Sequence, residues 1–526
     1  MTENKESEIL ECESSCSSFL SNYSMFALLF IVILGIGIRI YYFEGIDFDG
    51  SMYALQAKSI LEGTYNIYDL HYYDQGVRYS ILLPLALVYR LFGITELSTI
   101  SLVFIASTLQ IFFVYFFGKT LFNKHVGLIA AFLLAIFPID VNNATILEAD
   151  IIISLITSFS VFLFYQGYKK GRDYYFFISG LLLGFAFFAK IFSVLIFGVF
   201  LLYEIFFTKN LKKSFKTALF VVAGFIIITM PYFLYFYTST GDILYYYHQQ
   251  SEVNDQWIKL GELRSDLTYY PLNMILVSQG EEPPMFGIYF ILLFIAVLYY
   301  ARKKDVETRL LIVWFFILLM PLAGFPHIPK VQRYLILLEI PLILLISRML
   351  YDFATSTISK PMKVISLVAL SLIIVATNFS QYGTYDTFNT TVTFKGKEVL
   401  HEEKSVYLSL KDLPEKDVYI THYSELALLN FYFSYSKNSS TLYGYRGSTA
   451  TSFFDLHYVR DINQIHDSYL LLDKRYLKQD LDRFGWYAET DGSLEWFTIT
   501  QVPETWHVIL GIGNETTTHT ALFYVE

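Results

Sequence analysis

Long apolar segments recur along most of the chain, and short polar stretches separate them. A helix needs about 20 mainly apolar residues to cross the hydrocarbon core of a bilayer. The sequence holds eleven candidates, some of which need interfacial residues to reach that length: 25–43, 97–118, 125–139, 149–168, 175–189, 191–207, 214–237, 285–301, 308–324, 334–350 and 364–380. The pattern therefore predicts an α-helical protein that crosses the membrane about 11 times.

The first apolar run follows a polar N-terminal tail, residues 1–24. This run is too long for a cleavable signal peptide and lacks a small-residue cleavage site, so we expect it to stay as the first membrane anchor. Cys12 and Cys16 lie in the tail at helical spacing. A disordered tail is the expectation there, with a lipidation or metal site as the alternative.

Charge patterning predicts the orientation. Cytoplasmic loops of membrane proteins carry an excess of Lys and Arg. With a cytoplasmic N-terminus, each inward loop is basic: Lys119 and Lys124; Lys169, Lys170 and Arg172; Lys209, Lys212, Lys213 and Lys216; Arg302, Lys303, Lys304 and Arg309; Lys360 and Lys363. The first outward loops are acidic or mixed, with Glu44, Asp47, Asp49, Asp69 and Asp74, then Asp140, Glu148 and Asp150. The odd number of spans then places residues 381–526 outside the cell membrane.

The composition agrees with this reading. The 526 residues are 54% hydrophobic and 16% charged, and their mean hydropathy is +0.44. A typical soluble domain is about 25% charged. The net charge of −10 argues against nucleic acid as a partner, because nucleic-acid-binding proteins present basic surfaces.

Two outer loops are long, at 44–96 and 238–284. In the first, residues 51–62 have helical periodicity but are too short to cross the bilayer, so we expect a helix along the membrane surface. Residues 81–92 predict a shallow re-entrant or interfacial helix. The second loop is polar and aromatic. It could cover a site at the membrane face or serve as a plain connection.

The C-terminal residues 381–526 have a different pattern, with short strand-like pieces and helix-like pieces between them. We expect a small extracytoplasmic α/β domain. The predicted strands are 417–421, 468–472, 506–510 and 521–525, and the clearest helical piece is 425–432.

Acidic side chains lie close to the predicted outer membrane face. Asp47 and Asp49 follow the first span, and Glu148 and Asp150 open the fourth. Ionisable groups at a membrane boundary are costly unless they are used or exposed. The functional reading is a catalytic base or a metal ligand. The alternatives are solvated loop charge for the first pair and a favourable helix N-terminal charge for the second.

Cations are expected on the same face. Lys190 interrupts an apolar stretch, and His327, Lys330 and Arg333 lie in and after a short outer loop. Lys and Arg can hold a lipid phosphate, and Arg does so in a bidentate fork. The alternative is that these side chains are anchors that snorkel to the interface.

The ordered set of motifs resembles the type-C (GT-C) membrane glycosyltransferases. It is most similar to the family 39 group, which includes dolichyl-phosphate-mannose protein mannosyltransferases and lipid A aminoarabinose transferases. The resemblance covers residues 25–350. It rests on 39–43 (RIYYF), 49–54 (DGSMYA), 57–63 (AKSILEG), 78–84 (RYSILLP), 91–93 (LFG), 135–138 (AIFP), Asp150, 183–190 (LGFAFFAK) and 332–335 (QRYL).

The resemblance implies a polyprenyl- or dolichyl-phosphate-linked sugar as donor, a site at the outer membrane face and inversion at the anomeric carbon. It implies that Asp49 is the catalytic base and Asp150 a second essential acid. A base activates a hydroxyl acceptor, and cations stabilise the leaving phosphate. The cations expected to do so are Arg78, Lys190, Lys330 and Arg333, with Asp47, Glu148 and His327 as accessory residues.

One departure from the family pattern concerns the acceptor. The family often has Asp-Glu where this chain has Asp49-Gly50. The role of that Glu is missing here or is supplied by Glu44, Asp47 or Asp74. The acceptor, which can be protein, glycan or lipid, and the need for a divalent metal therefore stay open.

Three other functions are alternatives. An oligosaccharyltransferase of the same superfamily carries a Trp-Trp-Asp motif, but here Trp486, Trp496 and Trp506 stand apart. A transporter or flippase predicts paired repeats and charges near the bilayer midplane, whereas here the charges gather at one face. A sensor with a ligand-binding C-terminal domain leaves the elaborate first loop without a purpose.

Overall fold

The computed structural model divides the chain into two compact units, each treated separately below. The first comprises residues 1–43, 103–145 and 149–387, and the second 44–102, 146–148 and 388–526. The structure describes residues 23–43, 45–46, 48–67, 74–208, 211–259, 267–270, 286–303, 305–325, 328, 330, 332–356, 359–381, 409–410, 413–414, 416–420, 431, 442–444, 466–473, 505–512 and 520–526.

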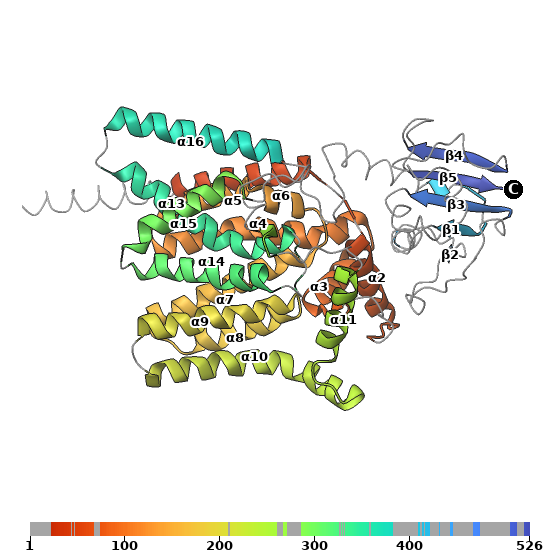
Figure 1. Cartoon of the computed structure of the whole chain (residues 1–526), viewed down its shortest axis with the longest axis horizontal. Coiled ribbons are helices and arrows are strands. Elements are labelled where there is room, and N and C mark those ends of the chain that lie inside the picture. The colour runs from red at the N-terminus through yellow and green to blue at the C-terminus, as the bar shows by residue number, and fades with distance from the viewer. Residues whose placement is uncertain are drawn as a thin grey trace, which may run out of the picture. The chain divides into compact units, whose positions relative to one another are not determined.

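The first unit is a helical bundle, in which α7, α8, α9, α10 and α14 run alongside one another (Figure 1). It begins with the helix Tyr23–Tyr41. The elements that follow are α4 (Glu96–Leu121, which starts in the second unit), α5 (Lys124–Ala135), α6 (Pro138–Asn143), α7 (Ala149–Lys170), α8 (Tyr174–Phe187), η2 (Ile191–Leu195), α9 (Ile196–Tyr203), η3 (Glu204–Thr208), α10 (Leu211–Thr240), α11 (Tyr245–Lys259), α13 (Ile288–Ala301), α14 (Val306–Gly324), η4 (Gln332–Leu338), α15 (Glu339–Thr355) and α16 (Lys360–Gln381).

Every predicted span coincides with helix, but the helices differ in length. Among the described residues, the helices that are long and apolar enough to cross a membrane are seven: Tyr23–Tyr41, Glu96–Leu121, Ala149–Lys170, Leu211–Thr240, Val306–Gly324, Gln332–Thr355 and Pro361–Asn378. Four other predicted spans are shorter apolar helices, namely Lys124–Ala135, Tyr174–Phe187, Ile191–Phe206 and Ile288–Ala301. The polytopic helical class is confirmed, and the count of eleven spans stays a prediction.

Glycine allows α8 and α10 to touch backbone to backbone. A Cβ atom at Gly180 of α8 would lie 2.0 Å from the carbonyl oxygen of Val221, and one at Gly224 of α10 would lie 2.3 Å from that of Phe177. Small residues at such crossings are typical of membrane helices, where close packing replaces the hydrophobic drive for association. The α8–α10 contact therefore depends on these two glycines.

The helices of the second unit include α2 (Phe48–Glu62), η1 (Asp74–Val77) and α3 (Tyr79–Phe92). The predicted short helices at 51–62 and 81–92 correspond to α2 and α3, which pack against each other. Gly63 follows α2 with a φ of +71° and Gly93 follows α3 with a φ of +78°. Glycine adopts such backbone angles readily, so both helices end where the sequence provides one.

The second unit also holds a five-stranded sheet in the order β2-β1-β3-β5-β4 (Figure 1). Its strands are β1 (Val418–Ile420), β2 (Leu442–Gly444), β3 (Ser468–Asp473), β4 (Trp506–Ile512) and β5 (Thr520–Val525). β1 pairs in parallel with β2 and β3, while β5 pairs antiparallel with β3 and β4. Four of the five were predicted. The three-residue β2 was not, and most of the predicted helix 425–432 lies outside the described residues.

Candidate active site

Asp150 is a fully buried carboxylate in the first turn of α7. The Lys190 ammonium, which follows α8, donates hydrogen bonds to both carboxylate oxygens at 2.7 Å. Arg333 on η4 places its Nε 3.7 Å from Asp150 Oδ2, an ion-pair distance longer than a hydrogen bond. Three separate segments of the first unit thus bring one carboxylate and two cations together. We call Asp150, Lys190 and Arg333 the Asp150 cluster.

An aromatic ring lines the Asp150 cluster. The Lys190 Nζ lies 4.4 Å from the ring centroid of Tyr334, within the range of a cation–π interaction. Tyr334 packs edge-on against Phe192, with 5.1 Å between the ring centroids. One carboxylate thus faces two cations within the Asp150 cluster. Cations held close together can bind an anionic ligand.

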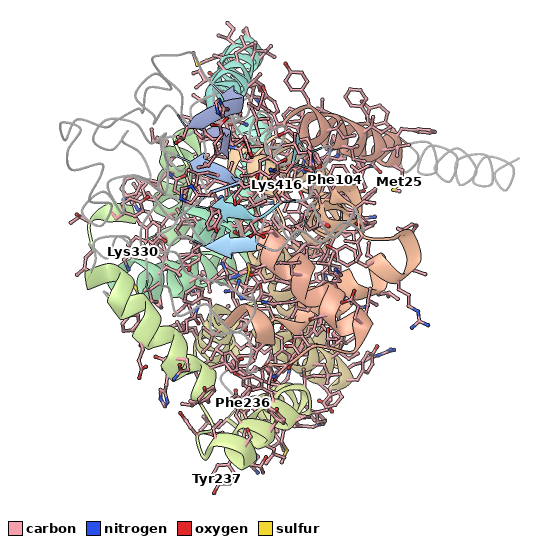
Figure 2. The ribbon with its side chains drawn as sticks, turned by 90° about the vertical axis from the view of Figure 1, so that its right-hand side faces the viewer. Met25, Phe104, Phe236, Tyr237, Lys330 and Lys416 are labelled. Atoms are coloured by element: carbon pink, nitrogen blue, oxygen red, sulfur yellow. The ribbon has the colours of Figure 1, made fainter. Side chains whose placement is uncertain are left out.

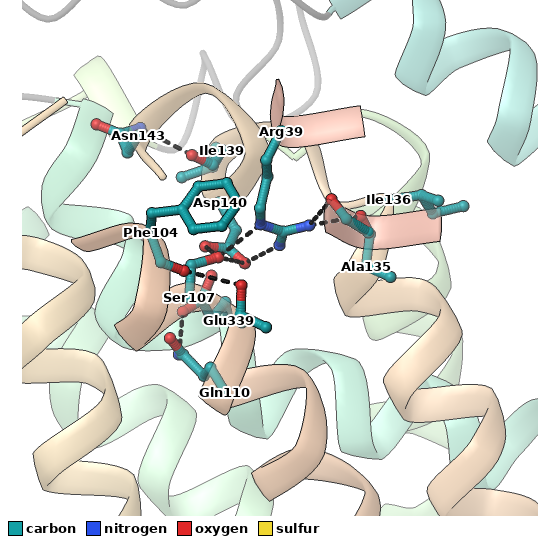
Figure 3. A network of polar contacts seen from close by, with 12 residues as sticks. Arg39, Phe104, Ser107, Gln110, Ala135, Ile136, Ile139, Asp140, Asn143 and Glu339 are labelled. Atoms are coloured by element: carbon teal, nitrogen blue, oxygen red, sulfur yellow. Dashed lines mark hydrogen bonds and ion pairs between the residues drawn. The ribbon is translucent and has the colours of Figure 1, made fainter. Parts of the chain in front are cut away.

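A second buried ion pair joins the first helix to α6 (Figure 3). Arg39 donates from Nη2 to Asp140 Oδ2 at 2.7 Å and from Nε to Ser107 Oγ at 2.7 Å. Its Nη1 donates to the carbonyl oxygens of Gly35 and Ala135, both at 3.0 Å. Burial raises the pKa of the Asp140 carboxyl, and the Arg39 charge opposes that rise. The Arg39–Asp140 pair is thus neutral as a unit, with all three guanidinium nitrogens engaged.

Asp49 belongs to the second unit, in the first turn of α2, and only 7% of it is exposed. Tyr53 and Gln56 follow on the same helical face and are fully buried. The Arg78 guanidinium donates from Nη1 to the Tyr53 hydroxyl and lies 5.6 Å from the centre of that ring. The α2 face therefore gathers an acid, a phenol and a cation, two of which the sequence had singled out.

The other predicted site residues have different surroundings. The Lys330 ammonium donates to the carbonyl oxygens of Leu322 and Phe325, at 2.6 and 2.7 Å, and so satisfies the C-terminal end of α14. Lys330 is labelled in Figure 2. Glu148 is buried in the second unit, with 1% of it exposed. Asp47 and His327 lie outside the described residues, as do Cys12 and Cys16. Among the residues that the structure describes, no three His, Cys, Asp or Glu side chains gather as a metal site.

Sequence reasoning missed three buried ionisable residues. Arg39 entered only as part of a motif, Asp140 only as loop charge, and Glu339 not at all. All three are fully buried. The sequence could have indicated Glu339, because a carboxylate inside the apolar stretch 334–350 is a candidate functional residue.

Known proteins share parts of this sequence pattern and this fold. A family model described as dolichyl-phosphate-mannose-protein mannosyltransferase matches residues 81–235, which include Asp150 and Lys190. ArnT from Cupriavidus metallidurans bound to undecaprenyl phosphate superposes with a TM-score of 0.60 and 12% identity, covering 94% of this chain and 97% of that one. The apo oligosaccharyltransferase of Archaeoglobus fulgidus gives 0.55 and 11%, covering 95% and 74%. No curated protein sequence matches the chain.

These similarities show the fold: the chain has the GT-C fold that ArnT and the Archaeoglobus oligosaccharyltransferase also have. ArnT superposes over nearly the full length of both chains. The predicted fold class and the predicted resemblance are both confirmed.

Proposed function

We propose that this protein transfers a sugar from a polyprenyl- or dolichyl-phosphate donor to an acceptor at the outer face of the cell membrane, as a hexosyl- or pentosyltransferase. The observation that carries the proposal is the Asp150 cluster, in which two cations meet one buried carboxylate within a GT-C fold. Such a donor brings a phosphate group to the membrane, which is the kind of anion that Lys190 and Arg333 can hold.

The proposed reaction is a single displacement with inversion. Asp49 takes the proton of the acceptor hydroxyl, and the acceptor oxygen forms a bond to the anomeric carbon. The bond from that carbon to the donor phosphate breaks, and the polyprenyl phosphate leaves with the electron pair. A positioned general base contributes typically about 10²–10⁴-fold in rate. Cations fixed where the leaving charge develops lower the barrier further.

Two further parts of the proposal rest on other grounds. The similar ArnT structure holds undecaprenyl phosphate, which supports a donor lipid of this chemistry. The basic loops support a cytoplasmic N-terminus and an outer location for residues 381–526. Arg78 is proposed as a further phosphate contact and Lys330 as one that acts from the end of α14.

An oligosaccharyltransferase is the second candidate, because the Archaeoglobus enzyme shares the fold at a TM-score of 0.55. The two candidates differ in what is transferred and to what. An oligosaccharyltransferase would move a whole glycan to Asn, whereas the first candidate moves one sugar. The separated tryptophans Trp486, Trp496 and Trp506 favour the first candidate.

The test is the transfer of radiolabelled sugar from a panel of polyprenyl-phosphate sugars to membrane acceptors, with purified full-length protein. Asp49→Asn should abolish transfer while the protein stays folded, because the amide cannot accept the proton. Glu62→Gln is the matched control, since Glu62 is an exposed acid at the end of the same helix. Transfer retained by Asp49→Asn would reject Asp49 as the base.

A further inference from the structure

Three buried polar side chains form a closed ring in the interior of the first unit. Gln110 of α4 donates from Nε2 to Ser154 Oγ at 2.9 Å and also to Glu339 Oε1. Ser154 Oγ lies 3.0 Å from the same Glu339 oxygen. Each of the three residues is at most 1% exposed. We call this the Gln110–Ser154–Glu339 ring, and part of it is visible in Figure 3.

The ring lies one helical turn from the Asp150 cluster. Ser154 follows Asp150 by four residues on α7, so both side chains lie on one face, about 6 Å apart along the axis. Ser154 Oγ also reaches the carbonyl oxygen of Ile336 at 3.2 Å. Ile336 follows Arg333 by three residues in η4, and residues three apart in a 3₁₀ helix lie directly above one another.

From this juxtaposition we infer that Ser154 is a positioning residue for the donor-phosphate site, and the inference rests on the proposed function. Its hydroxyl joins α7, which carries Asp150, to η4, which carries Arg333, one turn away from the place where the two charges meet. Gln110 and Glu339 hold that hydroxyl in place from α4 and the start of α15.

The two cations contact Asp150 at different distances. Lys190 grips Asp150 with two short hydrogen bonds, whereas the 3.7 Å between Arg333 Nε and Asp150 Oδ2 exceeds hydrogen-bond length. Because Arg333 lies on η4, the position of its guanidinium relative to Asp150 depends on how η4 is held against α7. A shift of about 1 Å at a site residue can cost about 10²-fold in rate, so the hold on η4 matters to the phosphate.

The chain supplies a matched control on the same helix. Ser160 of α7 is also fully buried, and its Oγ donates to the carbonyl oxygen of Ser179 on α8 at 2.8 Å. Ser160→Ala removes the same kind of interhelical hydrogen bond as Ser154→Ala but does not touch η4. A role in helix packing alone predicts that the two substitutions act alike.

The experiment measures the dissociation constant of undecaprenyl phosphate with purified full-length wild type, Ser154→Ala, Ser154→Thr and Ser160→Ala, together with their thermal midpoints. We expect Ser154→Ala to weaken binding about tenfold, Ser160→Ala to bind as wild type does, and both to lower the midpoint by similar amounts. Ser154→Thr keeps the hydroxyl and should restore binding.

The outcomes separate the inference from the proposed function. Equal binding by Ser154→Ala and Ser160→Ala would overturn the positioning role, whether or not the protein transfers sugar. The expected difference in binding, together with no transfer by wild type from any donor, would keep the positioning role at a phosphate site and reject the proposed reaction. Failure of Ser154→Thr to restore binding would also count against the hydroxyl as the cause.

Discussion

The Arg39–Asp140 pair and the Asp150 cluster are both buried ion pairs in the same helical bundle, but their charges balance differently. Arg39 meets one acid, and its remaining nitrogens donate to Ser107 and to two backbone carbonyls. Asp150 meets two cations, Lys190 and Arg333. The first arrangement pairs one cation with one acid, whereas the second brings two cations to one acid.

This difference separates a structural ion pair from a binding site. Buried charge is costly unless it is paired and hydrogen-bonded, so a chain that keeps only a neutral pair needs no ligand. Two cations that meet at one carboxylate provide donors for an anionic ligand. The number of cations in a cluster is thus more informative about function than the presence of a salt bridge alone.

The largest expected effect is on the neutral pair. Arg39→Met leaves Asp140 buried without its cation, and removing one partner of a buried pair typically costs about 3–5 kcal/mol of the free energy of unfolding. The double variant Arg39→Met with Asp140→Leu should recover most of that loss, because no charge is left unpaired. The measurement is unfolding of the purified protein in detergent. An Arg39→Met variant as stable as wild type would contradict the structural role.

Substitutions that keep the charge test the same comparison between the two sites, and we expect them to change stability less. Arg39→Lys keeps the charge but loses the fork that reaches Ser107, Gly35 and Ala135, so we expect a loss of about 1–3 kcal/mol from acceptors left unsatisfied. Lys190→Arg keeps a cation that can still donate to both Asp150 oxygens, so we expect a smaller loss of stability than for Arg39→Lys and a change in donor binding of only a few-fold. Unfolding midpoints and donor affinities of both variants check this. A larger loss of stability in Lys190→Arg than in Arg39→Lys would contradict the distinction between the two sites.

Much of this fold follows from patterns that the sequence shows. The apolar segments, the short helices of the first outer loop and four of the five strands all follow from periodicity and length. Periodicity does not predict the shortest elements. The strand β2, Leu442–Gly444, has only three residues, too few to show an alternation of polar and apolar side chains. The helix α11 was also missed, because its polar and aromatic residues give no apolar stripe.

The candidate site was predictable only in part. Asp150 and Lys190 stood out because each is a charge within an apolar stretch, and the structure brings them to 2.7 Å. The pairing itself depends on tertiary contacts between residues 40 positions apart, which one sequence does not reveal. For the same reason Lys330 looked equivalent to Arg333, although its ammonium binds the end of α14. Ser154 looked like any serine, since its role comes from Gln110 and Glu339, both distant in sequence.

The central claim is that the cations of the Asp150 cluster hold the donor phosphate, and the direct test is the affinity for undecaprenyl phosphate of wild type, Arg333→Ala and Arg348→Ala. Arg348 is the control because it lies on α15 and pairs with Asp352, 3.2 Å from its Nε. The account predicts that Arg333→Ala raises the dissociation constant about tenfold or more, equivalent to about 1.4 kcal/mol, and that Arg348→Ala leaves it unchanged. Equal affinity in wild type and Arg333→Ala would contradict the account.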